Sequence, residues 1–359
     1  MAHTLFWRKL SSRYSELVAV LIVSSFLCSC QPQDRVIKIS GTTFGTTYNI
    51  TVVGGTVAKA ELSMGIESLL SIVDEATSSY REDSEISLFN AAGINTEMKI
   101  SETLWQVLLI SKEVWDQSHG SFDPSVGALV ELWGFDDRDS VSIFPTDEEV
   151  EFATSKTGFD GLIMKADSDF YLLKKSRSLI LDVSAVAKGY AVDLIADYLA
   201  TLSLNNYLVE IGGELKVKGH NPKGQEWRVA IESASKFGSY DRLILLNQGA
   251  VATSGSYRNF FEKEGMRYSH IINPRSGYPL IHNLKSVTVI MDECAYADAW
   301  ATAFSVMSKE EAISTAIQLD IPLYIAGEDP TEKEPRMSPA FRRYNTELMG
   351  RQGGDSLSR

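Results

Sequence analysis

Short runs of β-branched and apolar residues, each ended by a turn residue, recur along this chain and constrain its fold more than any other feature. Val36–Ser40 and Thr46–Val53 are two such runs, with glycines at positions 41 and 45 between them. Further strand-like runs occupy residues 161–164, 170–173, 179–181, 207–211, 215–218, 227–231, 243–246 and 285–290. Such strands with turn residues between them predict an α+β fold of mainly antiparallel sheets flanked by helices.

Apolar residues recur at helical spacing in four segments, which lie within residues 62–73, 104–115, 187–198 and 295–307. We expect these helices to turn an apolar face to the core, and we expect a further helix and strand between Lys309 and Ile325. The stretch from Phe122 to Gly161 is rich in loop residues, and its acidic cluster 136–139 is typical of a solvated surface. The polar tail 350–359 is predicted to be disordered.

The first thirty residues have the pattern of an export signal rather than of a folded segment. Basic Arg8, Lys9 and Arg13 precede an apolar run at 17–27, about half of the roughly 20 residues that a membrane-spanning helix needs. Small residues and Cys30 follow, which resembles the bacterial lipobox, where the cysteine is acylated and becomes the first mature residue. Two alternatives are a retained transmembrane anchor and ordinary secretion with a free Cys30.

These features predict a signal peptide at 1–29, a lipidated tether at 30–35, one folded domain at 36–335 and a C-terminal segment at 336–359. The formal charge of −13 argues against a nucleic-acid partner, because no long stripe of Lys and Arg is present to neutralise phosphates. The histidines form no ligand-spaced pair and no CxxC motif occurs, which argues against a zinc site. Serine-hydrolase chemistry has no support either, since there is no GxSxG motif.

Asp298 and Thr302 lie four residues apart in the last strongly predicted helix, so their side chains share one face. A carboxylate and a hydroxyl are hard oxygen ligands of the kind that Mg²⁺ prefers, and Mg²⁺ completes its octahedron with water and substrate phosphate. An exposed Asp and Thr on an ordinary helix would have the same spacing. The pair is therefore compatible with either interpretation.

A second candidate site lies where a predicted strand leads into a helix, in the segment Asp182–Asp193. Ser184 is a natural N-cap, and the free backbone N–H groups of a helix start attract anions such as a pyrophosphate. Lys188 lies about one turn into the helix and adds a point charge. An ordinary capped helix is the alternative interpretation.

The segments 249–259 and 270–277 form a third candidate site. We expect the first, which is rich in small residues, to be a loop that a ligand can approach closely. The Ser, Arg and His side chains of the two segments are suited to contact phosphate or to move a proton. The Asn-Pro-x-x-Gly pattern at 273–277 is equally typical of a simple turn, and His270 on its own is compatible with a structural role.

Taken together, these segments resemble the ApbE family of FAD:protein FMN transferases, in order along nearly the whole mature chain. The segments that carry the resemblance are Gly41–Tyr48, Ser79–Arg81, Ser84–Ser87, Phe122–Gly127, Leu132–Phe135, Asp182–Asp193, Glu210–Glu214, Ala252–Gly255, His270–Gly277 and Ala297–Thr302. The resemblance implies a T-fold-like architecture. It also implies Mg²⁺-dependent transfer of FMN from FAD to a Ser or Thr hydroxyl of a target protein, through a phosphoester bond and with release of AMP.

The resemblance implies a role for particular positions. Asp298 and Thr302 would hold Mg²⁺ through side-chain oxygens, and the backbone carbonyl of Ala185 would be the third protein ligand. The positions that fall where the family contacts FAD are Phe44, Tyr80, Ser121, Phe122, Asp123, Asp182, Lys188 and Ile272. This chain departs from some relatives at Ala301, where they carry a second carboxylate, and at Asn273, where many have Asp.

A phosphoryl-transfer mechanism follows from the same resemblance. Mg²⁺, Lys188 and the helix start would neutralise the FAD pyrophosphate and the AMP leaving group, while an acceptor hydroxyl attacks the FMN-side phosphorus. A general base has to take the hydroxyl proton. His270 is the preferred base because histidine titrates near neutral pH, and Asp298 is the rival.

The resemblance also implies acceptors and a location. The acceptors would be subunits of membrane redox complexes of the Na⁺-translocating quinone reductase or Rnf type. The lipid anchor would hold the enzyme at the inner membrane, on the periplasmic side. Alternative functions are a Mg²⁺-dependent FAD pyrophosphatase that gives FMN and AMP, a flavin-binding lipoprotein without catalysis, and a generic solute-binding lipoprotein, which explains none of the motifs.

Overall fold

Alternating burial along the first two strands determines which of their faces meets the core. In the computed structural model, Ile37 and Ile39 of β1 (Val36–Thr43) are buried, as is Ile50 of β2 (Thr46–Val53), and the residues beside them are more exposed. The structure describes residues 35–135, 144–232, 240–255, 260–263, 266–280, 284–327, 336–344 and 346–348. The chain divides at Val36 into two units, and the fold described below is that of the second, Ile37–Arg359.

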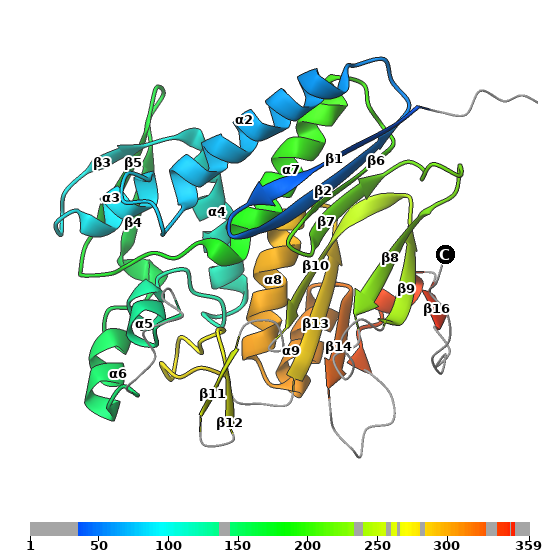
Figure 1. Cartoon of the computed structure of the whole chain (residues 1–359). Coiled ribbons are helices and arrows are strands. Elements are labelled where there is room, and N and C mark those ends of the chain that lie inside the picture. The colour runs from blue at the N-terminus through cyan, green and yellow to red at the C-terminus, as the bar shows by residue number, and fades with distance from the viewer. Residues whose placement is uncertain are drawn as a thin grey trace, which may run out of the picture. The chain divides into compact units, whose positions relative to one another are not determined.

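The largest sheet among the described residues has eight strands (Figure 1). In spatial order they are β1, β2, β6 (Tyr207–Ile211), β7 (Glu214–Lys218), β10 (Gln248–Gly255), β13 (Leu284–Met291), β14 (Leu323–Gly327) and β15 (Arg336–Met337). From β2 to β15 every neighbouring pair is antiparallel. The predicted α+β fold with mainly antiparallel sheets is confirmed.

Helices pack on one face of this sheet and a smaller sheet packs on the other (Figure 1). The helices are α2 (Lys59–Thr77), α7 (Ser184–Thr201) and α8 (Cys294–Val306), with α4 (Glu102–Gln117) against α7 and α8. The smaller sheet contains β8 (Trp227–Glu232), β9 (Tyr240–Leu246) and β16 (Thr346–Leu348), in the order β16-β9-β8. Successive side chains of β10 point to opposite faces of the sheet. Ala250 and Ala252 pack with the helices, and Val251 packs with the smaller sheet.

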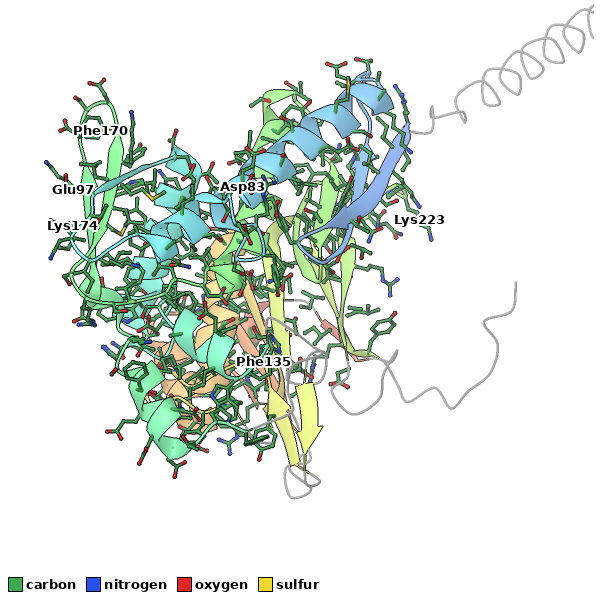
Figure 2. All side chains as sticks on the ribbon, turned by 60° about the vertical axis from the view of Figure 1, so that its left-hand side comes forward. Asp83, Glu97, Phe135, Phe170, Lys174 and Lys223 are labelled. Atoms are coloured by element: carbon green, nitrogen blue, oxygen red, sulfur yellow. The ribbon has the colours of Figure 1, made fainter. Side chains whose placement is uncertain are left out.

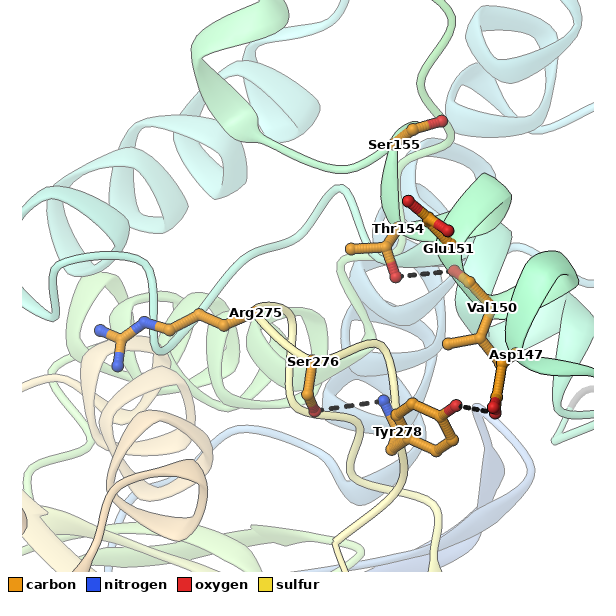
Figure 3. A pocket seen from close by; sticks show the side chains of 8 residues that line it. All are labelled: Asp147, Val150, Glu151, Thr154, Ser155, Arg275, Ser276 and Tyr278. Atoms are coloured by element: carbon orange, nitrogen blue, oxygen red, sulfur yellow. Dashed lines mark hydrogen bonds between the residues drawn. The ribbon is translucent and has the colours of Figure 1, made fainter.

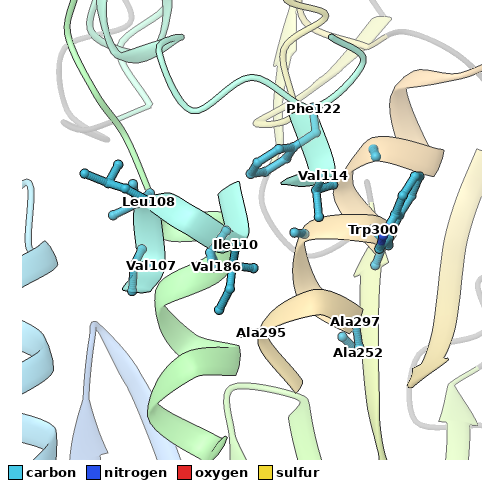
Figure 4. Close-up of a cluster of buried hydrophobic side chains, with 14 of the residues drawn as sticks. Val107, Leu108, Ile110, Val114, Phe122, Val186, Ala252, Ala295, Ala297 and Trp300 are labelled. Carbon is cyan, nitrogen blue, oxygen red and sulfur yellow. The ribbon is translucent and has the colours of Figure 1, made fainter. Parts of the chain in front are cut away.

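Small side chains allow α8 to lie close to its neighbours. Ala295 and Ala297 of α8 belong to the same buried cluster as Val186 of α7 and Ala252 of β10, and Trp300 fills the space at the other end (Figure 4). Alanine has little volume, so the two helices and the sheet approach one another without leaving a cavity. This packing places the two helices that carry the sequence candidates side by side. Within the described ranges, no helix has both the length and the apolar character needed to cross a bilayer.

A three-stranded sheet lies away from the main one. It has the order β3-β5-β4 and contains β3 (Met98–Ile100), β4 (Leu162–Ala166) and β5 (Tyr171–Lys175). Figure 2 shows Glu97, Phe170 and Lys174 at its outer edge, where the Glu97 and Lys174 side chains form an ion pair of 3.9 Å. The other elements are α3 (Glu85–Ala91), α5 (Gly127–Leu132), α6 (Asp147–Thr154), η1 (Phe159–Gly161), β11 (Phe260–Lys263), β12 (Met266–Ser269), α9 (Lys309–Gln318) and η2 (Phe341–Arg343).

Several local predictions were wrong. The small-residue segment expected to be a loop forms β10 as far as Gly255, because its alanines fit against α8. The expected strand at 179–181 makes only an isolated parallel bridge, between Ile180 and Val126. The stretch expected to be loops contains α5 and α6, and α6 begins with a capping box in which the Thr146 hydroxyl and the Glu149 carboxylate each accept a backbone N–H of the other residue. The cluster 136–139 lies outside the described residues.

Candidate active site

A single glycine allows α7 and α8 to touch. A Cβ atom at Gly189 would lie 2.7 Å from the Cα atom of Ala295, closer than real Cβ atoms approach backbone. The N–H of Gly189 donates a hydrogen bond of 3.2 Å to Oδ2 of Asp298. The candidate segment on α7 and the candidate metal ligand on α8 therefore belong to one site.

Asp298 is buried and has a lysine as its counterion. Nζ of Lys188 lies 3.5 Å from Oδ2 of Asp298 and 3.9 Å from Oε2 of Glu214. Burial raises the pKa of Asp298, and the Lys188 ammonium and the Gly189 amide oppose this rise. Burial alone would lower the pKa of Lys188, but the Asp298 and Glu214 carboxylates raise it above its ordinary value. Lys188 therefore remains protonated at neutral pH, beside two carboxylates.

Thr302 follows Asp298 by one helical turn, and its hydroxyl faces β10. Oγ1 of Thr302 and Oγ of Ser254 are 3.3 Å apart, within hydrogen-bonding distance. The hydroxyl of Thr253, next along β10, bonds to that of Thr288 on β13 over 2.9 Å. The Ser254 hydroxyl thus reaches the site from a strand rather than from the predicted loop.

The residues at this site fit a Mg²⁺ ion through the chemistry of their donors. Asp298 supplies a carboxylate whose burial favours a cation beside it, and Thr302 supplies a hydroxyl from the same helix face. Ala185, the predicted carbonyl ligand, lies in the first turn of α7, four residues before the amide that bonds Asp298. Across the described residues, no group of three His, Cys, Asp or Glu side chains is placed to share a metal ion. A cation here would therefore depend on hydroxyl and carbonyl oxygens as well as on carboxylate.

The start of α7 is capped differently from the sequence prediction. Ser184 is the first helical residue, the N-cap position belongs to Val183, and no side chain bonds there as an N-cap. Instead, Oδ1 of Asp182 accepts the N–H of Ser184 over 2.8 Å. A short carboxylate side chain can reach the amide two residues further on, which is the local pattern of an Asx turn. Ser184 is therefore not the cap, and Asp182 occupies an amide that we expected to face an anion.

The predicted FAD contacts at 121–123 are buried beside the core. Oγ of Ser121 is buried and has no hydrogen-bond partner among the described residues. Phe122 belongs to the helix-side core. The Asp123 carboxylate accepts the N–H and the hydroxyl of Ser125 over 2.8 and 2.6 Å, and Nε1–H of Trp115 over 3.3 Å. Asp123 thus holds its own loop in shape, whereas Ser121 has a hydroxyl available to a ligand.

The other predicted contacts lie on turns. Phe44 is partly buried in the β1–β2 turn and has a positive φ of 49°. Tyr80 is 76% exposed, and Ile272 is buried and forms a bridge with Pro279. His270, the predicted base, is half-buried directly after β12. The roles of these four residues in FAD contact and proton transfer stay predictions. Cys30, the predicted lipidation site, lies outside the described residues.

The Asn-Pro-x-x-Gly segment forms the turn that its sequence predicts. The N–H of Gly277 donates to the carbonyl of Asn273 over 2.8 Å, and Gly277 has a positive φ of 76°. This turn and α6 line a pocket of about 400 Å³, in which Tyr278 points toward Asp147 and Arg275 points away from both (Figure 3). A second pocket, of about 770 Å³, lies between α4, α7 and α8. Arg275 and Ser276 of the third candidate segment line the first pocket, and Tyr190 and Asp193 of the second candidate segment line the second. The residues to which the family resemblance assigns metal, FAD or base roles line neither pocket.

Two residues at the site had no assigned role from the sequence. Glu214 occurs in a segment that carries the family resemblance, and a signal for it was available: a charged residue directly after Gly212 and Gly213 begins a strand whose first position is buried. Ser254 had been counted only among the side chains of a loop. Its contact with Thr302 depends on the register of β10 against α8, for which the sequence carries no signal.

A family model and individual relatives of this chain both point to one protein family. Residues 44–325 match the model of the ApbE family. The chain is 38% identical over 300 residues to the FAD:protein FMN transferase of Vibrio cholerae, covering 83% of this chain and 89% of that protein. It is 34% identical to the FAD:protein FMN transferase of Haemophilus influenzae, covering 92% and 97%.

Solved structures agree with these relatives. The flavin transferase ApbE from Vibrio cholerae superposes with a TM-score of 0.80 and 35% identity, over 87% of this chain and all of that one. The apo form of the flavinyl transferase ApbE from Pseudomonas stutzeri gives a TM-score of 0.79 and 34% identity, over 88% and 98%. The similarity therefore extends over nearly all of the described fold.

Proposed function

This chain belongs to the ApbE family, and from that premise we propose that it transfers the FMN part of FAD to a Ser or Thr hydroxyl of a protein acceptor, with release of AMP. The observation that supports this most directly is the joining of Lys188, Asp298 and Thr302 at the contact between α7 and α8. FAD carries a pyrophosphate, and a site for breaking its linkage needs positive charge and hard oxygen ligands. This site supplies both.

In this reaction, individual residues would bind the metal, bind FAD or transfer the proton. Asp298, Thr302 and the Ala185 carbonyl would hold Mg²⁺, which when bound neutralises phosphate charge and stabilises the leaving oxygen. Lys188 would pair with a phosphate oxygen, since it already lies at this site as a charged ammonium. The Ser121 hydroxyl, which has no hydrogen-bond partner among the described residues, would form a hydrogen bond with FAD. The other residues that would contact FAD are Phe44, Tyr80, Phe122, Asp123, Asp182 and Ile272. His270 would accept the proton of the attacking hydroxyl.

The deciding experiment is an acceptor assay. Purified protein is incubated with FAD, Mg²⁺ and a candidate acceptor, and the acceptor mass is measured with and without EDTA. We expect a gain equal to one FMN unit only when Mg²⁺ is free, together with stoichiometric AMP. Release of free FMN and AMP without modified acceptor would instead indicate a FAD pyrophosphatase, and FAD binding without AMP release would indicate a non-catalytic flavin-binding protein.

We propose that the mature protein is acylated at Cys30 and lies on the periplasmic side of the inner membrane, near acceptor subunits of the Na⁺-translocating quinone reductase or Rnf type. The support is the signal-like sequence that ends at Cys30, together with the family membership. Mass spectrometry of the mature N-terminus tests the anchor. An unmodified Cys30, or a chain that starts at another residue, would refute it.

A further inference from the structure

Glu214 is a buried carboxylate that has no part in the function proposed above. It is 5% exposed, and its Oε2 lies 3.9 Å from Nζ of Lys188, whose other carboxylate neighbour is Asp298 at 3.5 Å. One ammonium therefore lies beside two buried carboxylates. A buried carboxylate costs free energy unless a cation lies close to it.

The hairpin between β6 and β7 fixes the backbone of Glu214. Gly212 and Gly213 form a two-residue turn with φ angles of 63° and 110°, so that Ile211 pairs directly with Glu214. The N–H of Gly213 also donates to Oε1 of Glu210 over 2.8 Å, which holds the turn in place. Glu214 is thus presented to Lys188 from a rigid strand end rather than from a loop.

We propose that Glu214 is a positioning residue that keeps Lys188 in the site when a divalent cation occupies the carboxylate of Asp298. The inference rests on the proposed function, because it takes Asp298 as a ligand of Mg²⁺. A cation at Asp298 repels an ammonium that lies 3.5 Å from the same carboxylate. The Ser184 carbonyl accepts a hydrogen bond from Nζ of Lys188 over 3.2 Å, and Glu214 adds the charge attraction that keeps Lys188 beside the substrate phosphates instead of releasing it to solvent.

The charge of Glu214 also affects the order in which ligands bind. Without a divalent cation, the carboxylates of Glu214 and Asp298 repel the FAD pyrophosphate. A bound cation offsets this repulsion and favours binding of the pyrophosphate. Glu214 therefore strengthens binding of Mg²⁺ and weakens binding of FAD in the absence of metal. A residue that merely supported the fold would change both affinities in the same direction.

The test uses Glu214→Gln, which keeps the shape of the side chain and removes its charge. Calorimetry gives the Mg²⁺ affinity, and flavin fluorescence in EDTA gives the metal-free FAD affinity. We expect Mg²⁺ to bind about fivefold or more weakly, from the loss of one nearby charge, and FAD to bind equally or more tightly. Glu214→Asp, which keeps the charge, should restore most of the Mg²⁺ affinity.

Glu210→Gln is the matched control, because it removes a carboxylate from the same hairpin. The Glu210 carboxylate accepts hydrogen bonds from the Asn49 side chain and the Gly213 N–H. Weaker binding of both ligands in Glu214→Gln, unchanged binding of both, or the same response in Glu210→Gln would overturn the inference. A wild-type protein that binds neither ligand would overturn the proposed function, and this inference with it. Thermal unfolding of each variant confirms that it is folded.

Discussion

The Asp298 carboxylate is the buried negative charge beside Lys188, and its charge can be removed without changing its shape. Asp298→Asn keeps the volume of the side chain and removes the charge. We expect FMN transfer to fall by about 100-fold or more, because the loss of a metal ligand removes stabilisation of the leaving group. The metal-free fold should remain stable, since Lys188 still has Glu214 as a carboxylate neighbour. The acceptor assay and thermal unfolding measure the two effects, and transfer at the native rate would contradict the metal role.

His270 tests the proton transfer independently of binding. His270→Ala is expected to lower the rate of transfer by about 100-fold, a usual effect of losing a general base, while FAD affinity changes little. Single-turnover transfer and flavin fluorescence give the two values. An equal loss in both would assign His270 to binding and would leave Asp298 as the candidate base.

At the residue scale, the sequence could identify side chains but not their partners. The spacing of Asp298 and Thr302 placed them on one helix face, and the structure confirms that they lie on α8. The bonds from Asp123 to Trp115 and Ser125 and the pairing of Lys188 with Asp298 depend on tertiary packing. Helical and strand periodicity carry no signal for such contacts, and this is why these bonds could not be predicted from the sequence.

At the scale of elements, the contact between α7 and α8 depends on Gly189. Gly189→Ala would place a methyl group 2.7 Å from the Cα atom of Ala295, and backbone cannot move aside as a side chain can. We expect the free energy of unfolding to fall by about 2 kcal/mol, because the strain of overpacking exceeds the roughly 1 kcal/mol that alanine gains over glycine in a helix. Chemical denaturation measures the change, and Mg²⁺ affinity should fall with it because Asp298 moves away from the Gly189 amide.

Gly65→Ala on α2 is the matched control. The added methyl group there would meet the ring of Tyr198, the far end of a flexible side chain that can turn away. We therefore expect stability near that of the wild type, with Mg²⁺ affinity unchanged. Equal destabilisation by the two substitutions would show that the backbone contact at Gly189 constrains the packing no more than a flexible side chain does.

Element prediction succeeded where one periodicity dominated. The helix segments at 62–73, 104–115 and 187–198 lie within α2, α4 and α7, and the segment at 295–307 runs one residue past the end of α8 at Val306. Most of the alternating runs are strands. β10 was missed because Gly249, Ala250 and Ala252 have low strand propensity. Ala250 and Ala252 are required by the closeness of α8, a tertiary constraint that overrides the local preference.

At the scale of the whole molecule, the sequence placed the end of the folded domain at residue 335, yet later residues contribute to the core. β15 pairs with β14, and β16 pairs with β9 of the smaller sheet. Phe341 is fully buried between the two sheets, and its ring lies 5.3 Å from that of Tyr324. The contribution of these residues to the core could not be predicted from their polar, Pro-containing sequence, because a single buried aromatic residue produces no periodic pattern.

Two truncations and one substitution test this boundary. A chain that ends at residue 335 lacks Phe341 and exposes the apolar face that β8 and β9 share with the main sheet, so we expect it to unfold or to aggregate. Phe341→Ala in the full chain should lower the free energy of unfolding by about 3 to 5 kcal/mol, the usual range for truncating a buried phenylalanine. Removal of 350–359 alone, a polar segment with no periodic apolar pattern, should leave the free energy of unfolding unchanged. If the chain ending at residue 335 unfolded with the wild-type midpoint in denaturant, the segment after it would be an appendage and the packing of Phe341 would contribute nothing to the fold.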